Sequence, residues 1–292
     1  MAAARRGRRV LIVEIGEQER MPSIFGAARA GYAGAQVYGR GTPGVAPIWS
    51  MCLTAREALH EFAVRTVKFE VIYEAIFENR VMRYFTAAAP GLDDLTLLGK
   101  IESLHREVMA PTKRAKFDLM IFDAPATGHG LAFFDMPLSA MRMTRVGPLY
   151  EKVERMWRLL ADPARTAFNI VTLPEEMSVN ESIELNDAAE AMRLPRGKVV
   201  VNGVYPDVFA DDRHEIGRLV RERTVAPTPS DRIARAIIGS ARSVMTIRDA
   251  HDGMIDTLAD RLPQPRVILP FLFRPRIGRE EIETLADGLE AF

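Results

Sequence analysis

The chain has 292 residues, 48% of them hydrophobic, enough for one large α/β domain or two smaller ones with a substantial core. Lys plus Arg and Asp plus Glu both number 39, and a net charge of zero gives no support for nucleic acid or an anionic membrane as main partner. The single cysteine, Cys52, excludes an internal disulfide framework and fits a cytoplasmic setting, and no apolar run approaches the roughly 18 residues of a transmembrane segment.

Short β-branched runs alternate with long amphipathic stretches along the chain. Near-continuous apolar runs such as VLIV and LMIF suit strands that are covered on both faces. Strand–helix alternation of this kind predicts an α/β fold with a doubly wound, mostly parallel sheet. In chain order, the predicted strands are Val10–Val13, Ile48–Cys52, Leu119–Asp123, Phe168–Leu173, Val199–Val204 and Val267–Phe271.

Two capping boxes indicate helix starts, one at Thr54–Glu57 and one at Ser178–Glu181. Leu97, Ile101, Leu104 and Val108 form one apolar stripe at helical spacing. The stretch between the second and third strands is too long for a simple crossover, which predicts a helical insertion over roughly 53–116, and a second helical segment follows over roughly 132–162. Further helices are predicted over Asp211–Arg223, Ser230–Ser240, Ile247–Arg261 and Arg279–Leu289, and loops over Gly31–Pro47, Pro206–Asp212 and Thr224–Ser230.

The segment Phe117–Leu131, FDLMIFDAPATGHGL, contains the strongest candidate for chemistry. A buried strand ends on the carboxylate of Asp123, and a small Gly/Thr turn, Ala124–Gly130, follows it. An acid at the carboxyl end of a parallel strand, followed by a mobile turn, is how nucleotide triphosphatases hold Mg²⁺ and sense the γ-phosphate. Asp123 is therefore a candidate Mg²⁺ ligand, and the alternative is that it only caps the turn.

FDAPATGHGL resembles the switch segment of the ArsA-type anion-transporting ATPases, whose common form is DTAPTGHTL. Without a gap, Asp123 falls on the family's Asp, and Thr127, Gly128 and His129 match as well. The family includes the arsenite-pump ATPase and the ATPase that delivers tail-anchored proteins, and the DAPATGH form is similar to a bacterial branch. The resemblance implies a sheet of P-loop NTPase type, a single domain over 1–292, and ATP with Mg²⁺ as cofactors. It also implies that Asp123, Thr127, Gly128 and His129 form the catalytic switch, with Asp123 at the metal.

Further segments resemble the same family in the same order along the chain. IVTLPEEMSVNESIEL, Ile170–Leu185, resembles the family's strand, Pro-Glu turn and helix. VVVNGVYP resembles the strand end whose Asn recognises adenine, which implies that role for Asn202. An amide offers the donor and the acceptor that an adenine edge requires, although Asn-Gly also forms simple turns. LPFLF resembles the late loop that packs on the base, which implies a contact from Pro270.

The sequence departs from the family at its phosphate loop. That loop supplies backbone N–H groups, a Lys and a hydroxyl to the phosphates and Mg²⁺, but no GKS or GKT occurs in this sequence. The family's loop would precede Val10 by about a helix length, so we expect an N-terminally truncated chain that hydrolyses little ATP. A gapless alignment puts Gly16 where the family has a water-positioning Asp. Glu14, Glu17 and Glu19 are nearby substitutes, and the alternative is a solvated acidic loop.

The strand before the phosphate loop lies in the middle of the family's sheet. Its absence predicts exposed edges on the neighbouring strands, Val10–Val13 and Leu119–Asp123.

Two functions are consistent with this sequence. The first is an ArsA-family ATPase, dimeric, that couples MgATP binding and hydrolysis to a closing motion of its helical region. The second is a non-catalytic pseudo-ATPase subunit that pairs with an active paralogue and binds a hydrophobic protein client. Either a homodimer or a heterodimer fits the resemblance.

The family's paired zinc cysteines and arsenite-binding cysteines are absent, which disfavours arsenite transport. The residues Met136, Met141, Met143 and Met156 form an adaptable client surface or face a helical core.

Overall fold

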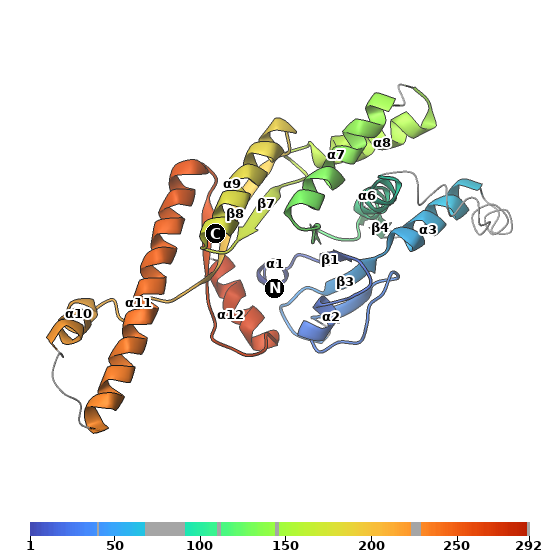
Figure 1. The fold of residues 1–292 in the computed structure, drawn as a ribbon. Helices are drawn as coiled ribbons and strands as arrows, with labels where there is room; N and C mark the ends of the chain where they lie inside the picture. The colour runs from blue at the N-terminus through green and yellow to red at the C-terminus, as the bar shows by residue number, and fades with distance from the viewer. Residues whose placement is uncertain (40, 68–90, 110–111, 144–145, 223–228, 291–292) are drawn as a thin grey trace. The chain divides into compact units, whose positions relative to one another are not determined.

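A computed structural model describes residues 1–39, 41–67, 91–109, 112–143, 146–222 and 229–290 (Figure 1). These residues form two compact units of mixed α/β structure, and each unit is described by itself. Unit 1 contains Met1–Thr166, Met192–Pro195 and Arg276–Glu290. The described part of unit 2 contains Ala167–Ala191 and Arg196–Pro275. The single domain over 1–292 stays a prediction.

Unit 1 is built on a four-stranded sheet with the order β2-β3-β1-β6. β1 (Val10–Ile15) lies inside the sheet and pairs in parallel with β3 (Ile48–Leu53) and with β6 (Leu119–Phe122). β2 (Ala35–Tyr38) adds an antiparallel edge beside β3, in a stretch where the sequence predicts only a loop. The sheet is therefore mostly parallel, as predicted.

The strand edges differ from the prediction in one respect. β1 has a partner on both sides, so the prediction of an exposed edge on residues 10–13 is wrong. The reason is that β3 and β6 take its two edges directly. β6 has a described strand on one side alone, and its Ile121 is 46% exposed.

The helices of unit 1 follow the predicted apolar patterns over most of their lengths. In α6, Leu97, Ile101 and Leu104 are buried, but Val108 is exposed because the helix ends at His105 and Val108 starts a short hairpin. The insertion over roughly 53–116 stays a prediction, and residues 68–90 within it lie outside the described part. The other elements of unit 1 are α1 (Ala2–Arg5), α2 (Met21–Ile24), α3 (Ala55–Val67), α6 (Leu92–His105), β4 (Val108–Met109), β5 (Arg114–Ala115), α7 (Thr127–Met143), α8 (Pro148–Leu160) and α12 (Arg279–Glu290).

The Met-rich segment after β6 is partly core. Phe133 and Phe134 of α7 are buried and pack edge-to-face on each other. Phe122 of β6 stacks on Phe133 and meets Phe134 edge-on. Met156 of α8 is buried as well, Met136 and Met141 are half-buried, and Met143 at the end of α7 is exposed. The core interpretation therefore holds for the buried side chains, and the client surface stays a prediction for the others.

α3 begins with the predicted capping box. The Glu57 N–H donates to Thr54 Oγ1 at 3.3 Å, and the Thr54 hydroxyl donates to the Glu57 carboxylate at 2.6 Å. The side chain of Thr54 thus satisfies one of the N–H groups that a helix start leaves unpaired.

Replacing Thr54 with alanine is expected to lower the free energy of unfolding by about 1 kcal/mol, because the Glu57 N–H loses its acceptor. Urea unfolding followed by tryptophan fluorescence measures the change. Thr54→Ser keeps the hydroxyl and is expected to retain most of the stability, so an equal loss in both variants would contradict the capping role.

Unit 2 contains a three-stranded, fully parallel sheet with the order β7-β8-β9. Val199 and Val201 of β8 are buried against Leu258 and Leu262 of α11 and against α9. The opposite face is more open, and Val171 of β7 is 68% exposed. The elements are β7 (Phe168–Thr172), α9 (Glu176–Ala191), β8 (Arg196–Val204), α10 (Arg213–Glu222), α11 (Pro229–Arg261) and β9 (Arg266–Pro270).

Two helix boundaries in unit 2 differ from the prediction. α9 begins at Glu176, so Ser178 lies inside the helix, where its carbonyl accepts bonds from the hydroxyls of Thr172 and Ser182. α11 is one helix where the sequence predicts two. Hydroxyls near the expected break, such as Thr246, donate to carbonyls of their own helix instead of capping a new one.

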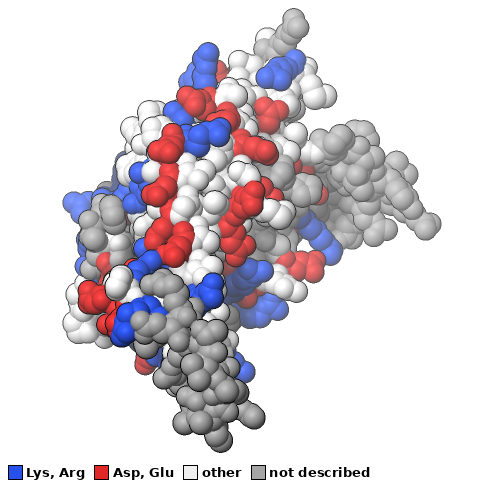
Figure 2. Space-filling view, turned by 60° about the vertical axis from the view of Figure 1, so that its left-hand side comes forward, with Lys and Arg blue, Asp and Glu red and all other residues white. Residues whose placement is uncertain are grey.

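The charges on the surface are mixed. On the face drawn in Figure 2, acidic and basic side chains lie among one another. Among the described residues, no helix has the length and hydropathy to cross a bilayer.

Candidate functional site

Asp123 lies directly after β6 in unit 1. Its N–H donates to the carbonyl of Val13 at 2.9 Å, which extends the β6–β1 ladder by one residue and fixes the main chain there. Its side chain is exposed, and among the described residues it makes no hydrogen bond or ion pair. An uncommitted carboxylate therefore stands at the carboxyl end of a parallel strand, where open α/β sheets bind ligands.

The segment after Asp123 is more regular than predicted. α7 begins at Thr127, so residues 127–130 form the first helical turn and not a flexible loop. Gly130 is buried, and a Cβ at this position would lie 2.7 Å from the carbonyl oxygen of Pro125. Glycine is thus required for close packing rather than for backbone motion. The side chains of Thr127 and His129, and the surroundings of Gly128, lie outside the described part of the structure.

The acidic candidates after β1 serve the fold. Glu14 is 3% exposed, and its two carboxylate oxygens accept bonds from the N–H groups of Arg20 and Met21, at 2.9 and 3.2 Å. Glu19 accepts bonds from the N–H groups of Ala30 and Gly31 at 2.7 and 2.9 Å. The solvated-loop interpretation is wrong for these two residues, because both carboxylates are bound to the main chain. Neither is free to orient a water molecule.

The other two positions of this loop differ from each other. Gly16 has a φ of 120°, a left-handed value that an aspartate would adopt only under strain. Glu17 is exposed, and its role as a substitute for the family's water-positioning Asp stays a prediction.

Cys52 is a structural thiol. Its S–H donates to the carbonyl of Gly16 at 3.0 Å, and burial, followed by the charge of Glu14, raises the pKa of the thiol. The protonated form is the less nucleophilic one, so Cys52 is not suited to nucleophilic chemistry.

In unit 2, the structure brings Asn202 and Pro270 to neighbouring strands. Val204 of β8 pairs with Pro270 of β9, and a register irregularity lies between Val201 and Val204. Val201 faces the buried side, so the alternation of a strand turns Asn202 to the opposite, more open face. Among the described residues, the Asn202 amide makes no hydrogen bond, which leaves both its donor and its acceptor free.

An aromatic cluster follows the ends of β8 and β9, within the segments VVVNGVYP and LPFLF. Tyr205 stacks on Phe271, with ring centroids 5.0 Å apart, and both rings contact Phe273 edge-on. Phe271 and Phe273 are exposed. A Cβ on Gly203 would lie 3.5 Å from Leu173 and 3.9 Å from Phe271, so apolar side chains reach the residue next to Asn202. The sequence resemblance pointed to both segments, but it did not predict that their aromatic rings contact one another.

A separate cavity of about 690 Å³ lies at the amino ends of the strands of unit 1. Its lining includes Trp49, Phe117 and the cations Lys116 and Arg9. Arg9 donates to Asp118 at 2.7 and 2.8 Å, which lowers the pKa of that carboxyl to about 2, and Lys116 pairs with Glu107 at 2.9 Å. The cations are thus already paired, and the cavity is at the opposite strand ends from Asp123.

Comparison with known proteins shows a likeness to one family of ATPases. The family model for "Anion-transporting ATPase" matches residues 138–225, a stretch that contains Asn202 but not Asp123. "ATPase BagA" of Mycobacterium tuberculosis is 27% identical over 201 residues, which cover 68% of this chain and 58% of that protein. Over these stretches, the chain is similar to the ArsA-type ATPases.

More distant relatives come from other lineages. "ATPase GET3C" of Arabidopsis thaliana is 23% identical over 158 residues, covering 43% of this chain and 39% of that protein. "Putative arsenical pump-driving ATPase" of Halobacterium salinarum is 25% identical over 158 residues, covering 50% of this chain and 24% of that protein. The chain thus spans 58% of the length of its mycobacterial relative, and its activity and partners are treated below as proposals.

Proposed function

We propose that this chain acts as part of an ArsA-type ATPase that binds an adenine nucleotide and couples MgATP binding and hydrolysis to conformational change. The observation that carries the proposal is the free amide of Asn202 beside exposed apolar and aromatic side chains at the carboxyl end of a parallel sheet. The likeness to ArsA-type ATPases supports the nucleotide class, and the chemistry of the side chains supports the adenine.

The proposed binding of the adenine base is supported by the complementary chemistry of the side chains. The Asn202 amide donates one hydrogen bond and accepts another, which matches the donor and acceptor of an adenine edge. Phe271 and Pro270 offer apolar surface for the flat face of a base, and Phe271 is 43% exposed. A purine is thus recognised by an amide at its edge and by an apolar surface on its face.

The proposed binding of Mg²⁺ depends on the carboxylate of Asp123. Mg²⁺ at a nucleotide takes one or two carboxylates together with phosphate oxygens and waters. Among the described residues, no three His, Cys, Asp or Glu side chains converge to hold a metal. A lone exposed carboxylate therefore fits a Mg²⁺ ion that arrives with the nucleotide, and Asp123 would hold it directly or through water. When bound, Mg²⁺ neutralises the charge of the phosphates.

The non-catalytic subunit remains the second candidate, favoured by two observations. The sequence has no GKS or GKT to hold the phosphates. Glu14 and Glu19 are bound to the main chain, so they do not replace the family's water-positioning Asp. On this alternative, the chain pairs with an active paralogue as a heterodimer and contributes to client binding, whereas the first candidate is compatible with a homodimer.

Replacing Asn202 with alanine is expected to weaken adenosine binding about tenfold, because two hydrogen bonds to the base are lost. Adenosine is the probe because its binding requires no phosphate loop. NMR titration of the full chain measures the dissociation constant, with guanosine as the competing base. Asn180→Ala is the matched control, since Asn180 is an exposed asparagine of α9 with no partner among the described residues.

Equal affinity for adenosine in the wild type and Asn202→Ala, or equal affinity of the wild type for guanosine, would refute the adenine site. Phosphate release from MgATP separates the two functions. If the wild type hydrolyses MgATP and Asp123→Asn abolishes this hydrolysis, the ATPase is supported. If the chain binds adenosine but hydrolyses no MgATP, either as it is or after a phosphate loop has been added to it, the non-catalytic subunit is favoured.

A further inference from the structure

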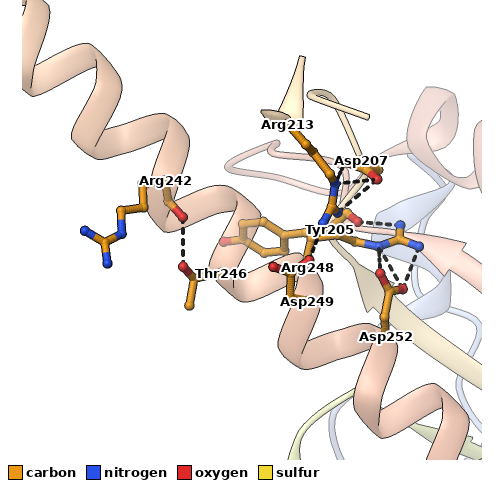
Figure 3. Close-up of polar contacts among 8 residues, drawn as sticks. All are labelled: Tyr205, Asp207, Arg213, Arg242, Thr246, Arg248, Asp249 and Asp252. Carbon is orange, nitrogen blue, oxygen red and sulfur yellow. Dashed lines mark hydrogen bonds and ion pairs between the residues drawn. The ribbon is translucent and has the colours of Figure 1, made fainter. Parts of the chain in front are cut away.

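The main chain of Tyr205, the first residue after β8, is held by side chains of α11. The Tyr205 N–H donates to Nδ1 of His251 at 3.2 Å. Arg248 donates from Nη1 to the Tyr205 carbonyl at 2.9 Å (Figure 3). Residues 248 and 251 are three positions apart, so they lie on the same face of the helix. We call this pair of bonds the Tyr205 clamp.

The clamp takes over where the sheet ends. The last ladder bond of β8 is donated by the Phe271 N–H to the Val204 carbonyl at 2.8 Å. Tyr205 follows the strand and is half-buried, so its N–H and carbonyl find their partners outside the sheet. Helix α11 supplies them from its side chains, three residues after Asn202.

Arg248 is itself fixed in place. Asp252, one turn further along α11, accepts from its guanidinium at 2.9 and 3.0 Å. Next to this pair, Arg213 of α10 binds both Asp207 and Asp249, so the loop after Tyr205 is tied to α11 a second time (Figure 3). The residues that follow β8 are thus anchored to α11 by charge as well as by hydrogen bonds.

We propose that His251 and Arg248 are positioning residues that, by holding the main chain of Tyr205, keep the base-binding surface at the ends of β8 and β9 in place. The Tyr205 ring stacks on Phe271 and contacts Phe273, so displacement of Tyr205 displaces the surface beside Asn202. This inference rests on the proposed adenine site. It adds α11, a helix with no residue in that site, as the element that sets the geometry of the site.

The clamp depends on pH. His251 is 9% exposed, and its ring meets the Tyr205 ring edge-on with centroids 5.4 Å apart. Burial lowers the pKa of His251 from its ordinary 6.5; the nearby charge of Arg248 acts in the same direction, and Glu175 and Asp252 oppose it. Nδ1 accepts the Tyr205 N–H only while the imidazole is neutral.

The sign of the effect follows from the lowered pKa. The stabilisation from neutral His251 is complete above the ordinary pKa of 6.5 and declines as the pH falls below it. In the folded chain the bond itself breaks at the lowered pKa, where His251 takes up a proton.

Two readouts on the full chain labelled with nitrogen-15 tyrosine test the clamp. One is the Tyr205 amide resonance, assigned with Tyr205→Phe among the 6 tyrosines, and the other is adenosine affinity. Between about pH 8 and about pH 5, the Tyr205 amide of the wild type is expected to titrate with a midpoint below 6.5. Adenosine affinity is expected to fall about fivefold over the same range, the size of one lost hydrogen bond.

The variants separate positioning from folding. His251→Gln keeps an acceptor without a titrating group, so its Tyr205 amide and adenosine affinity are expected to be independent of pH. His251→Ala and Arg248→Met are expected to bind adenosine weakly at every pH. Thr246→Ala is the matched control, because among the described residues the Thr246 hydroxyl bonds to Arg242 of its own helix alone, and the variant is expected to behave as wild type (Figure 3).

Each outcome is decisive for one of the two proposals. Wild-type affinity in His251→Ala, or a pH-dependent loss that persists in His251→Gln, overturns the positioning role. If adenosine shifts no resonance at any pH, the adenine site is refuted, and the clamp is then judged on the Tyr205 amide. An amide that titrates identically in wild type and His251→Gln overturns the clamp as well.

Discussion

Replacing Leu258 with alanine is expected to lower the free energy of unfolding of unit 2 by about 2–5 kcal/mol. Leu258 lies on α11, is 0% exposed and packs in the cluster with Val199 and Val201 of β8. Truncation removes apolar contacts and leaves a cavity between the helix and the sheet. The lost contacts and the cavity each destabilise the folded state. Because α11 also carries the Tyr205 clamp, the same variant is expected to weaken adenosine binding.

Urea unfolding followed by circular dichroism measures the loss. Ile237→Ala is the matched control, since Ile237 lies on the same helix but is exposed, and its truncation is expected to change the stability by less than about 0.5 kcal/mol. Comparable losses in the two variants would show that α11 is not anchored through Leu258.

Replacing Glu14 with alanine is expected to destabilise unit 1 by about 2–4 kcal/mol, because the N–H groups of Arg20 and Met21 lose a charged acceptor in a buried site. The carboxylate joins the carboxyl end of β1 to the start of α2. A catalytic carboxylate would show the reverse pattern, since its removal commonly leaves the stability unchanged or raises it while activity falls.

Glu14→Gln retains one acceptor oxygen and is expected to lose about half as much stability as alanine. Glu17→Ala, an exposed acid in the same loop, provides the control and is expected to be neutral. Thermal unfolding by differential scanning fluorimetry ranks the variants. A Glu14→Ala protein as stable as wild type would reopen the interpretation of Glu14 as a functional acid.

Local sequence signals located most of the regular structure. All of the predicted strands are present, because apolar β-branched runs of this length are buried in few other ways. The capping box at Thr54 marks a true helix start because its two bonds form between residues three apart, whatever the rest of the chain does. The helix start predicted by the similar pattern at Ser178 is wrong, because the helix there already starts at Glu176.

Local sequence patterns did not predict the antiparallel strand β2 or the continuity of helix α11. β2 lies in a Gly/Pro-rich stretch and forms because the edge of β3 offers backbone partners. α11 is continuous over Pro229–Arg261, and its Leu258 and Leu262 pack on β8, a contact that no local pattern records.

The sequence by itself determined the family-like order of segments, the position of Asp123 at a strand end and that of Asn202 within a strand. These depend on short patterns and on residue type. Only the tertiary structure decided that Glu14 and Glu19 serve the fold, and that α11 holds Tyr205 beside an aromatic cluster. The physical reason is that a carboxylate or an imidazole acquires its role from partners distant in the chain, and burial decides whether its bonds remain free for a ligand.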